Sequence, residues 1–240
     1  MAVPSSGSPD RLRDLWGHER PDILVVDQMY DIMMRFPLLI WALFCITLKS
    51  RDLVPYMNKH PLDFVYLADI LSRLSATIFL LLIAVVVIAR TRPSAKASGI
   101  KPRIAALAGT FLTYAIALFS RRELSVSMEM TSTVLILIGT LGAVVALAQL
   151  GRSFSIMAET RKLVTSGPYR FVRHPLYLTE EIAMLGIFLQ FASVWAALIL
   201  ALQIIFQLRR MDNEEAVLTS QFLEYATYSQ TTARLIPGIY

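Results

Sequence analysis

The chain has 240 residues, of which 55% are hydrophobic and only 17% are charged. Its mean hydropathy of +0.55 is far above that of an ordinary soluble domain. The formal net charge of +5 is gathered in particular loops, which indicates membrane orientation rather than nucleic-acid binding. The sequence therefore predicts an all-α, polytopic membrane helical bundle.

The N-terminal segment, residues 1–35, is predicted to be an extension of that bundle. Its first thirty residues carry acids throughout and lack a basic start followed by an apolar core, so no cleavable signal is expected. Acidic and apolar residues alternate over Asp10–Arg35, which fits a helix lying on the membrane surface. The single cysteine, Cys45, excludes an internal disulfide.

Five uncharged runs follow in chain order: Phe36–Leu48, Leu74–Ala89, Ile104–Ser120, Thr131–Gly151 and Ile182–Leu208. A helix needs about 20 largely apolar residues to cross the hydrocarbon core. The fourth run meets that length alone, and flanking residues with snorkelling side chains extend the second and third. Met33 and Met34 extend the first. Residues 36–151 are therefore predicted to hold transmembrane helices 1–4.

The last run is long enough for one tilted span of roughly 40 Å. It also fits a tight hairpin that begins near Pro175 and turns near Gln190–Ser193. Cytoplasmic loops collect lysine and arginine. With six crossings and both termini in the cytoplasm, the inner segments hold most of the 23 basic residues, whereas a single final span moves the basic residues of the tail outside. The hairpin is preferred, and about 5–6 transmembrane helices are expected.

Polar residues are unusually dense in GPYRFVRHPLYLTEE, residues 167–181. Turn residues at 166–168 predict a loop before it. His174 precedes a proline and is biased away from helix, whereas Pro175 suits a first helical turn. The hairpin would return RRMDNEE, residues 209–215, to the same membrane face. We therefore expect cations and carboxylates from both ends of the hairpin to converge at the cytoplasmic surface.

Four glutamines lie in or beside the apolar runs, and a regularly spaced set of apolar and aromatic residues lies in the tail. Four glutamines are expected to form hydrogen bonds between helices: Gln149, Gln190, Gln203 and Gln207. In the tail, Leu218, Phe222 and Tyr225 have i, i+4, i+7 spacing, which predicts a stripe lying along the membrane or capping the bundle. His18 and His60 are scattered, so no metal site is expected.

Two blocks, LVTSGPYRFVRHPLYLTEE (163–181) and RRMDNEEAVLTSQFLEYATYSQTTARLIPGIY (209–240), resemble the isoprenylcysteine carboxyl methyltransferase and phospholipid N-methyltransferase superfamily. The resemblance rests on the Arg-His-Pro-x-Tyr-x-x-Glu run and on an arginine four or five residues before a glutamate pair. Members are integral membrane enzymes that transfer a methyl group from S-adenosylmethionine (SAM) to a lipophilic acceptor. The resemblance implies that 152–240 holds a cytosolic cofactor-binding loop, the hairpin and a catalytic tail.

The resemblance also implies which residues hold the cofactor: Lys162, Leu163, Val164, Gly167, Tyr169, His174, Pro175, Tyr177, Glu214 and Glu215. On physical grounds, the carboxylate of the SAM amino-acid head needs a cation, for which Arg173 or His174 is placed. The adenine needs an aromatic slot, which Tyr169, Phe171 and Tyr177 can line. The sequence has no G-x-G-x-x-G fingerprint, so a nucleotide site here must be of another kind.

For catalysis, methyl transfer requires alignment of the acceptor and exclusion of water. Arg210 and Glu215 match the arginine and the second glutamate of the family. Arg210 is expected to orient the acceptor or neutralise its carboxylate, and Glu215 to orient Arg210 or hold the cofactor. Glu214 is nearly as good a candidate for that second role. A local ion-pair cluster on one helix is the structural alternative.

The acceptor stays open between an isoprenylcysteine-like carboxylate, a phospholipid amine and a thiol. We expect it to enter from the bilayer lipids while SAM enters from the cytosol. Two other functions fit part of the sequence. Membrane sterol reductases carry a related Arg-His-Pro-x-Tyr-x-x-Glu run and bind NADPH, but usually have an asparagine where this chain has Leu176. A non-catalytic membrane scaffold would have little reason to keep Arg210, Glu214 and Glu215.

Overall fold

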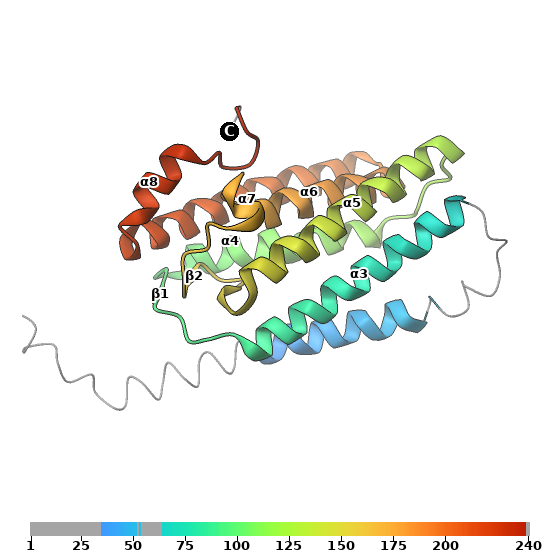
Figure 1. The fold of residues 1–240 in the computed structure, drawn as a ribbon. Coiled ribbons are helices and arrows are strands. Elements are labelled where there is room, and N and C mark those ends of the chain that lie inside the picture. Colours follow the sequence, from blue (N-terminus) through green and yellow to red (C-terminus); the bar gives the residue numbers. More distant parts are fainter. Residues whose placement is uncertain (1–34, 52, 54–63, 239–240) are drawn as a thin grey trace, which may run out of the picture. The chain divides into compact units, whose positions relative to one another are not determined.

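The computed structural model describes residues 35–51, 53 and 64–238. The chain divides into two units, Met1–Pro37 and Leu38–Tyr240. The predicted surface helix in the N-terminal extension lies outside the described residues. The second unit holds every element labelled in Figure 1.

The described part of the second unit is built almost entirely from helices (Figure 1), as the all-α prediction requires. Residues 38–51 are helical. The longer elements that follow are α3 (Phe64–Ala89), α4 (Ile100–Phe111), the 3-10 helix η1 (Leu112–Leu118), α5 (Val126–Leu150), α6 (Pro175–Phe191), α7 (Val194–Gln221) and α8 (Glu224–Thr231). Two short 3-10 helices, η2 (Gly151–Ser153) and η3 (Gly167–Arg170), and two short strands, β1 (Ala95–Lys96) and β2 (Glu159–Thr160), complete it.

Three helical segments are long and apolar enough to cross a membrane: Tyr66–Ala89, Val126–Ser153 and Val194–Gln221. They correspond to the second, fourth and last predicted runs. The third predicted run instead forms α4 followed by η1, so its regular α-helix is shorter than a full span. The expectation of five to six crossings with both termini in the cytoplasm remains a prediction.

The hairpin predicted in the last apolar run is confirmed. Helix α6 ends at Phe191 and α7 begins at Val194, and the Ser193 hydroxyl accepts a hydrogen bond from the Ala196 N–H at 3.1 Å as an N-cap. Two glutamines of α7 then bond back to α6. Gln203 donates to Glu181 at 2.8 Å, and Gln207 donates to Glu180 at 3.3 Å. Of the four glutamines expected to bond between helices, Gln190, Gln203 and Gln207 do so, whereas Gln149 donates to Ser166 of the loop before η3.

The helix pair α5 and α6 packs at very close range through small residues. A Cβ added at Gly186 of α6 would lie 2.7 Å from the Ser132 carbonyl oxygen, and one at Gly142 of α5 would lie 2.5 Å from Thr179. The Ser132 hydroxyl donates to the Gly186 carbonyl at 2.8 Å. Small residues allow this approach, and an interhelical hydrogen bond reinforces it, as is common between membrane helices.

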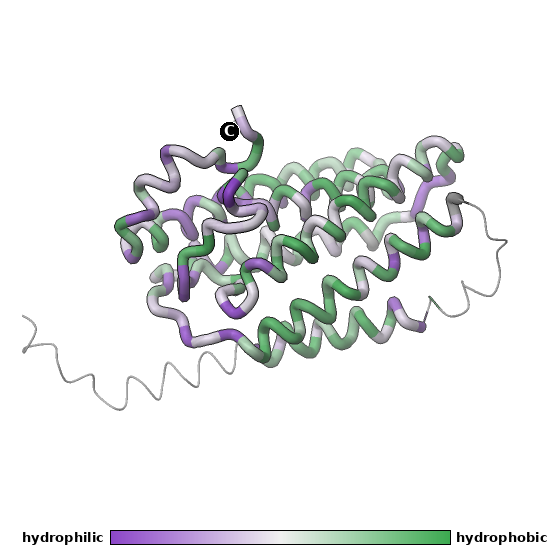
Figure 2. Tube along the Cα trace, viewed as in Figure 1, coloured by the Kyte–Doolittle hydropathy of each residue, from purple (hydrophilic) through white to green (hydrophobic). Residues whose placement is uncertain are grey.

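Hydrophobic residues predominate along the helices. Hydrophilic residues gather mainly at the end of the second unit with α8 and the connecting loops, and a smaller group lies at the opposite end (Figure 2). A buried apolar cluster reaches the end with α8. Its members near the loops include Leu147 of α5, Phe154 of the following loop and Leu176 of α6, all 5% exposed or less. The apolar core therefore continues up to the region where the predicted site residues lie.

Candidate active site

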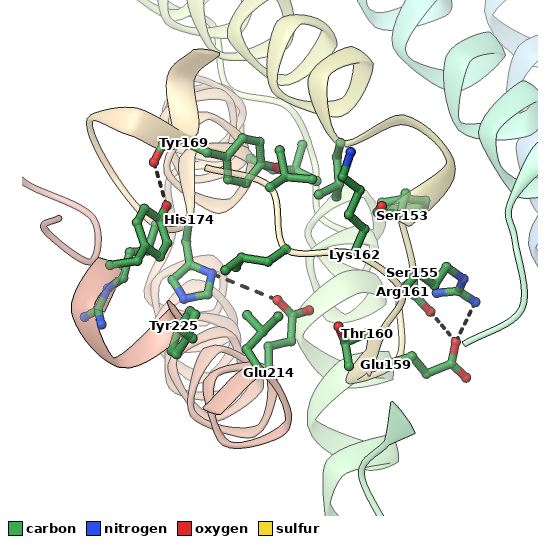
Figure 3. A pocket seen from close by; sticks show the side chains of 18 of the residues that line it. Ser153, Ser155, Glu159, Thr160, Arg161, Lys162, Tyr169, His174, Glu214 and Tyr225 are labelled. Atoms are coloured by element: carbon green, nitrogen blue, oxygen red, sulfur yellow. Dashed lines mark hydrogen bonds and ion pairs between the residues drawn. The ribbon is translucent and has the colours of Figure 1, made fainter. Parts of the chain in front are cut away.

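A pocket opens at the polar end, between the loop after α5, the start of α6, the C-terminal half of α7 and α8. The space between its walls is about 760 Å³ with the open mouth included. His174, Tyr169, Glu214 and Tyr225 lie toward one end of the pocket, and Ser155, Glu159, Thr160 and Arg161 toward the other (Figure 3). The apolar side chains of Leu150, Phe154 and Leu176 also line the pocket.

The loop after α5 is anchored to the end of α3. Arg152 donates from Nε to the Ala89 carbonyl at 2.8 Å. Strands β1 and β2 pair antiparallel, with Ala95 opposite Thr160. These bonds satisfy backbone groups that a polar loop would otherwise expose, so they give one wall of the pocket a fixed backbone.

A buried carboxylate marks the far end of the pocket. Glu159 accepts from the Ser155 hydroxyl at 2.9 Å and from Nη2 of Arg161 at 2.9 Å. The side chains of Arg161 and Glu159 are only 1% and 8% exposed. Arg161 also donates from Nε to the Thr91 carbonyl at 2.5 Å. Buried charges are tolerated when they are paired and hydrogen-bonded in this way.

His174 lies where the loop meets α6. It is the residue before the first helical turn, with φ −125° and ψ 58°, and Pro175 is the first residue of α6. Both local predictions are confirmed. The His174 ring is buried, stacks on Tyr177 with centroids 5.4 Å apart, and has Nε2 2.8 Å from Oε1 of Glu215.

The buried arginine of α7 contacts residues of α4, α6 and α7. The Arg210 residue is 3% exposed, and its guanidinium carbon lies 4.6 Å from the Tyr177 ring centroid. Its Nη1 donates to Thr110 at 3.0 Å, and its Nε lies 3.7 Å from Glu214. The Tyr177 hydroxyl donates to the same Glu214 oxygen. Of the two glutamates, the structure thus pairs Arg210 with Glu214, one helical turn away, rather than with Glu215.

Glu215 instead faces the loop and the C-terminal tail. Besides His174, its Oε1 has Nε of Arg234 at 3.2 Å and Nε of Arg173 at 3.6 Å. Arg234 also donates from Nη2 to Asp212 at 2.6 Å. One carboxylate oxygen therefore links α7 to both the loop and the tail.

Three tyrosines line the pocket where η3 faces α8: Tyr169 of η3, and Tyr225 and Tyr228 of α8. The Tyr228 hydroxyl donates to the Tyr169 carbonyl at 2.5 Å. Burial is the main cause that raises the pKa of Tyr228, to about 12, and it also raises the pKa of Tyr169 and Tyr225 above the ordinary tyrosine value. These phenols stay protonated at neutral pH. The Tyr228 hydroxyl donates a hydrogen bond, whereas the Tyr225 hydroxyl is buried without a partner among the described residues.

Most of the residues predicted from sequence line this one pocket: Lys162, Leu163, Val164, Tyr169, Arg173, His174, Tyr177 and Glu214. Arg210 and Glu215 lie behind the wall and contact residues that line it. Pro175 begins α6 beside His174. Gly167, at φ +60°, lies against Gln149 and allows the turn that carries Tyr169. Phe171 is 65% exposed and is not among the lining residues, so an aromatic slot that includes it is not formed.

Sequence reasoning missed several lining residues: Ser153, Phe154, Ser155, Glu159, Thr160, Arg161, Leu218, Tyr225 and Tyr228. The first six lie between the end of α5 and the predicted Lys162–Val164, and a polar break after a long apolar run was the available signal. The predicted tail stripe is interrupted, because α7 ends at Gln221 and α8 begins at Glu224. Leu218 and Tyr225 nevertheless meet at the pocket.

Comparisons with known proteins match the segment of the chain that supplies most of the pocket. Residues 132–220 match the model of the isoprenylcysteine carboxyl methyltransferase (ICMT) family. The predicted family resemblance is confirmed for this segment. The ICMT-like segment runs from α5 through the loop, α6 and nearly all of α7, so it supplies the pocket except for the part formed by α8 and the tail.

Two curated relatives are named for metal resistance. The cobalt-zinc-cadmium resistance protein CzcN of Cupriavidus metallidurans is 33% identical over 114 residues, which cover 45% of this chain and 51% of that protein. The nickel-cobalt-cadmium resistance protein NccN of Alcaligenes xylosoxydans xylosoxydans is 31% identical over 113 residues, covering 45% and 52%. The chain thus spans about half the length of these relatives. Among the described residues, no group of three or more His, Cys, Asp or Glu is arranged to hold a metal ion.

Proposed function

We propose that this protein is an integral membrane methyltransferase that uses SAM and transfers its methyl group to a lipophilic acceptor. The observation that carries the proposal is that residues far apart in the sequence converge on one pocket. Residues from two sequence blocks, 162–177 and 210–215, meet at one pocket that opens beside helices apolar enough to cross a membrane. The ICMT family match over residues 132–220 covers most of the same pocket and supports the same activity.

The pocket offers groups that suit each part of SAM. When bound, SAM supplies a methyl group on a positively charged sulfonium. The apolar part of the lining, which includes the aromatic ring of Phe154, suits the adenine. Glu214 presents a carboxylate to the pocket and suits the ammonium of the amino-acid head or the nearby sulfonium charge. Arg173 and His174 supply the basic side of the site.

The charged residues of α7 then position the groups of the reaction centre. Arg210 keeps the Glu214 carboxylate close to the Tyr177 hydroxyl, while Thr110 fixes the guanidinium from α4. Such pre-set geometry aligns reactants and excludes water, which can contribute about 7–11 kcal/mol in favourable cases. We propose Arg210, Glu214 and Glu215 as the residues that organise the reaction centre, with Arg210 acting toward the acceptor through this arrangement.

The acceptor is proposed to come from the membrane. Helices α4, α6 and α7 are joined by Gln203, which donates hydrogen bonds to Glu181 and to the Gly109 carbonyl. Ionisable groups within apolar membrane helices are costly and usually functional. The isoprenylcysteine-like carboxylate, the phospholipid amine and the thiol all remain candidate acceptors. The metal-resistance names belong to the relatives and add no acceptor to this set.

The test is calorimetric titration of the detergent-purified protein with S-adenosylhomocysteine and, separately, with NADPH. We expect micromolar binding of S-adenosylhomocysteine to the wild type and loss of binding in His174→Ala. Arg170→Ala is the matched control, because Arg170 is exposed and lies outside the pocket lining. Binding of NADPH alone would instead indicate a reductase, and binding of neither ligand would favour a scaffold.

A further inference from the structure

Arg173 differs from the other arginines around the pocket. Arg210 and Arg234 each donate hydrogen bonds to named partners, and Arg161 is bonded to Glu159 and Thr91. The Arg173 side chain lines the pocket, is 15% exposed, and has its Nε buried without a hydrogen-bond partner in the described part of the chain. Its contact with Glu215, at 3.6 Å, is an ion pair beyond hydrogen-bond distance.

His174, the other cation considered for the same task, is already engaged. Its Nε2 lies 2.8 Å from Glu215, and its ring stacks on Tyr177 with an interplanar angle of 11°. Its Nδ1 lies 4.0 Å from Glu214, so both nitrogens of the ring already face a glutamate carboxylate. Arg173 has unused donors and an open side toward the pocket, so it suits an anionic group far better.

Arg234 explains why Glu215 does not hold Arg173 more closely. Its Nε is 3.2 Å from the Glu215 oxygen, and its side chain is only 11% exposed. Asp212 accepts from the same guanidinium at 2.6 Å and fixes its direction. Glu215 is thus neutralised from the tail side by Arg234.

The tail that carries Arg234 is fastened to the loop by its backbone. The Arg173 N–H donates to the Ala233 carbonyl at 2.8 Å, and the His174 N–H donates to the Arg234 carbonyl at 3.2 Å. Val172 and Ala233 form a parallel bridge. A substitution of the Arg234 side chain leaves these backbone bonds in place. It therefore separates the role of the Arg234 charge from the role of the backbone attachment between tail and loop.

We infer that Arg173 receives the carboxylate of the ligand's amino-acid head, and that Arg234 is the positioning residue that keeps Arg173 available by holding Glu215. This inference rests on the proposed SAM site and says which way round the ligand lies. The amino-acid head points toward Arg173 and the tail. The adenosine is then directed to the opposite end of the pocket, toward Ser153 and Thr160.

The experiment compares S-adenosylhomocysteine with its decarboxylated analogue, whose head keeps the amine and lacks the carboxylate. Because a hydrogen-bonded charge pair is lost, Arg173→Gln is expected to weaken S-adenosylhomocysteine binding roughly 10- to 100-fold. The same variant should change the affinity for the analogue by less than about threefold, since the analogue never used Arg173. Arg170→Gln serves as the control of equal charge change.

Arg234→Gln is also expected to weaken binding of S-adenosylhomocysteine but not of the analogue. The loss of affinity should be smaller, roughly 3- to 10-fold, because Glu215 would then compete for Arg173. Arg234→Lys keeps a cation beside Glu215 and should recover most of the affinity. Arg209→Gln is the matched control, because Arg209 is near the same Asp212 at 4.0 Å but its side chain is 74% exposed. Thermal unfolding of each variant checks that it folds.

The outcomes are distinguishable. If the wild type binds neither ligand, the proposed SAM site itself fails. If the wild type binds S-adenosylhomocysteine but Arg173→Gln weakens both ligands equally, or neither, the carboxylate assignment is overturned while the SAM site stands. If Arg234→Gln weakens both ligands equally and Arg234→Lys gives no recovery, Arg234 only supports the fold and the positioning role is overturned.

Discussion

The α5–α6 helix pair and the pocket are neighbours in the fold, yet they are stabilised by different forces. Between α5 and α6, Gly186 packs against Ser132, and Gly142 packs against Thr179, with almost no charge involved. Around the pocket, two glutamates, Glu214 and Glu215, collect the contacts of arginines, a histidine and a tyrosine.

This difference follows from the two solvents. In a bilayer, association gains little from burying apolar area, so close packing of small residues and a few hydrogen bonds must hold helices together. At the pocket, charged groups leave water and must be compensated by partners, so removal of one partner leaves another buried and unpaired. Substitutions should therefore fail by overpacking in the first region and by orphaned charge in the second.

The largest expected effect is at the buried arginine of α7. Arg210→Gln leaves Glu214 without its cation and should lower the free energy of unfolding by about 3–5 kcal/mol. Thermal unfolding in detergent measures this change. Arg209→Gln, the adjacent but exposed position, should stay within about 0.5 kcal/mol. Equal effects at the two positions would show that burial of the charge does not matter here.

Removal of one hydroxyl in the pocket should give the next largest effect. Tyr177→Phe takes a donor from the Glu214 carboxylate, at a cost of about 1.5–3 kcal/mol for a hydrogen bond to a charged group. We expect the loss mainly in affinity for S-adenosylhomocysteine, because Glu214 lines the pocket. Tyr114→Phe, on η1 and outside the pocket lining, is the control, and unchanged affinity in Tyr177→Phe would contradict the role of Glu214.

The helix pair is tested by adding volume. Gly186→Val would drive new atoms into the Ser132 carbonyl and Ile136, and overpacking of this kind typically costs about 1–3 kcal/mol. Stability should fall while the affinity of the folded fraction for S-adenosylhomocysteine is retained. Leu141→Val, at a residue that is 49% exposed on α5, is the control and should have little effect. Loss of affinity without loss of stability would erase the distinction between the two regions.

The smallest effect on stability is expected for the tyrosine of α8 that bonds to η3. Tyr228→Phe removes the bond to the Tyr169 carbonyl and should cost about 0.5–1.5 kcal/mol of stability. Burial raises the Tyr228 pKa to about 12, above the ordinary value near 10. The stabilisation is therefore complete below about pH 10 and is lost as the pH rises toward 12. Stability profiles of the two proteins should converge over that window, and parallel profiles would contradict the assignment.

The sequence predicted the site residues better than it predicted their partners. The Arg-His-Pro-x-Tyr run and the glutamate pair were recognisable because each needs fixed spacing within one segment. Glu159, Arg161 and Arg234 carry no such local signal, since they reach the pocket through β2 pairing and through the tail's bridge to the loop. The identity of the glutamate that faces Arg210 also depended on helix geometry, because i, i+4 neighbours share a face and i, i+5 residues do not.

Composition and hydropathy by themselves determined the helical class and the apolar runs, because a helix that crosses hydrocarbon must satisfy its own backbone and present apolar side chains. The hairpin was likewise predictable from the distribution of basic residues and was confirmed by the turn at Ala192–Ser193. Only the tertiary structure decided that Arg210 pairs with Glu214, that Arg234 pairs with Glu215, and that Arg173 faces the pocket. Those assignments depend on distances between elements far apart in the chain, which no local spacing encodes.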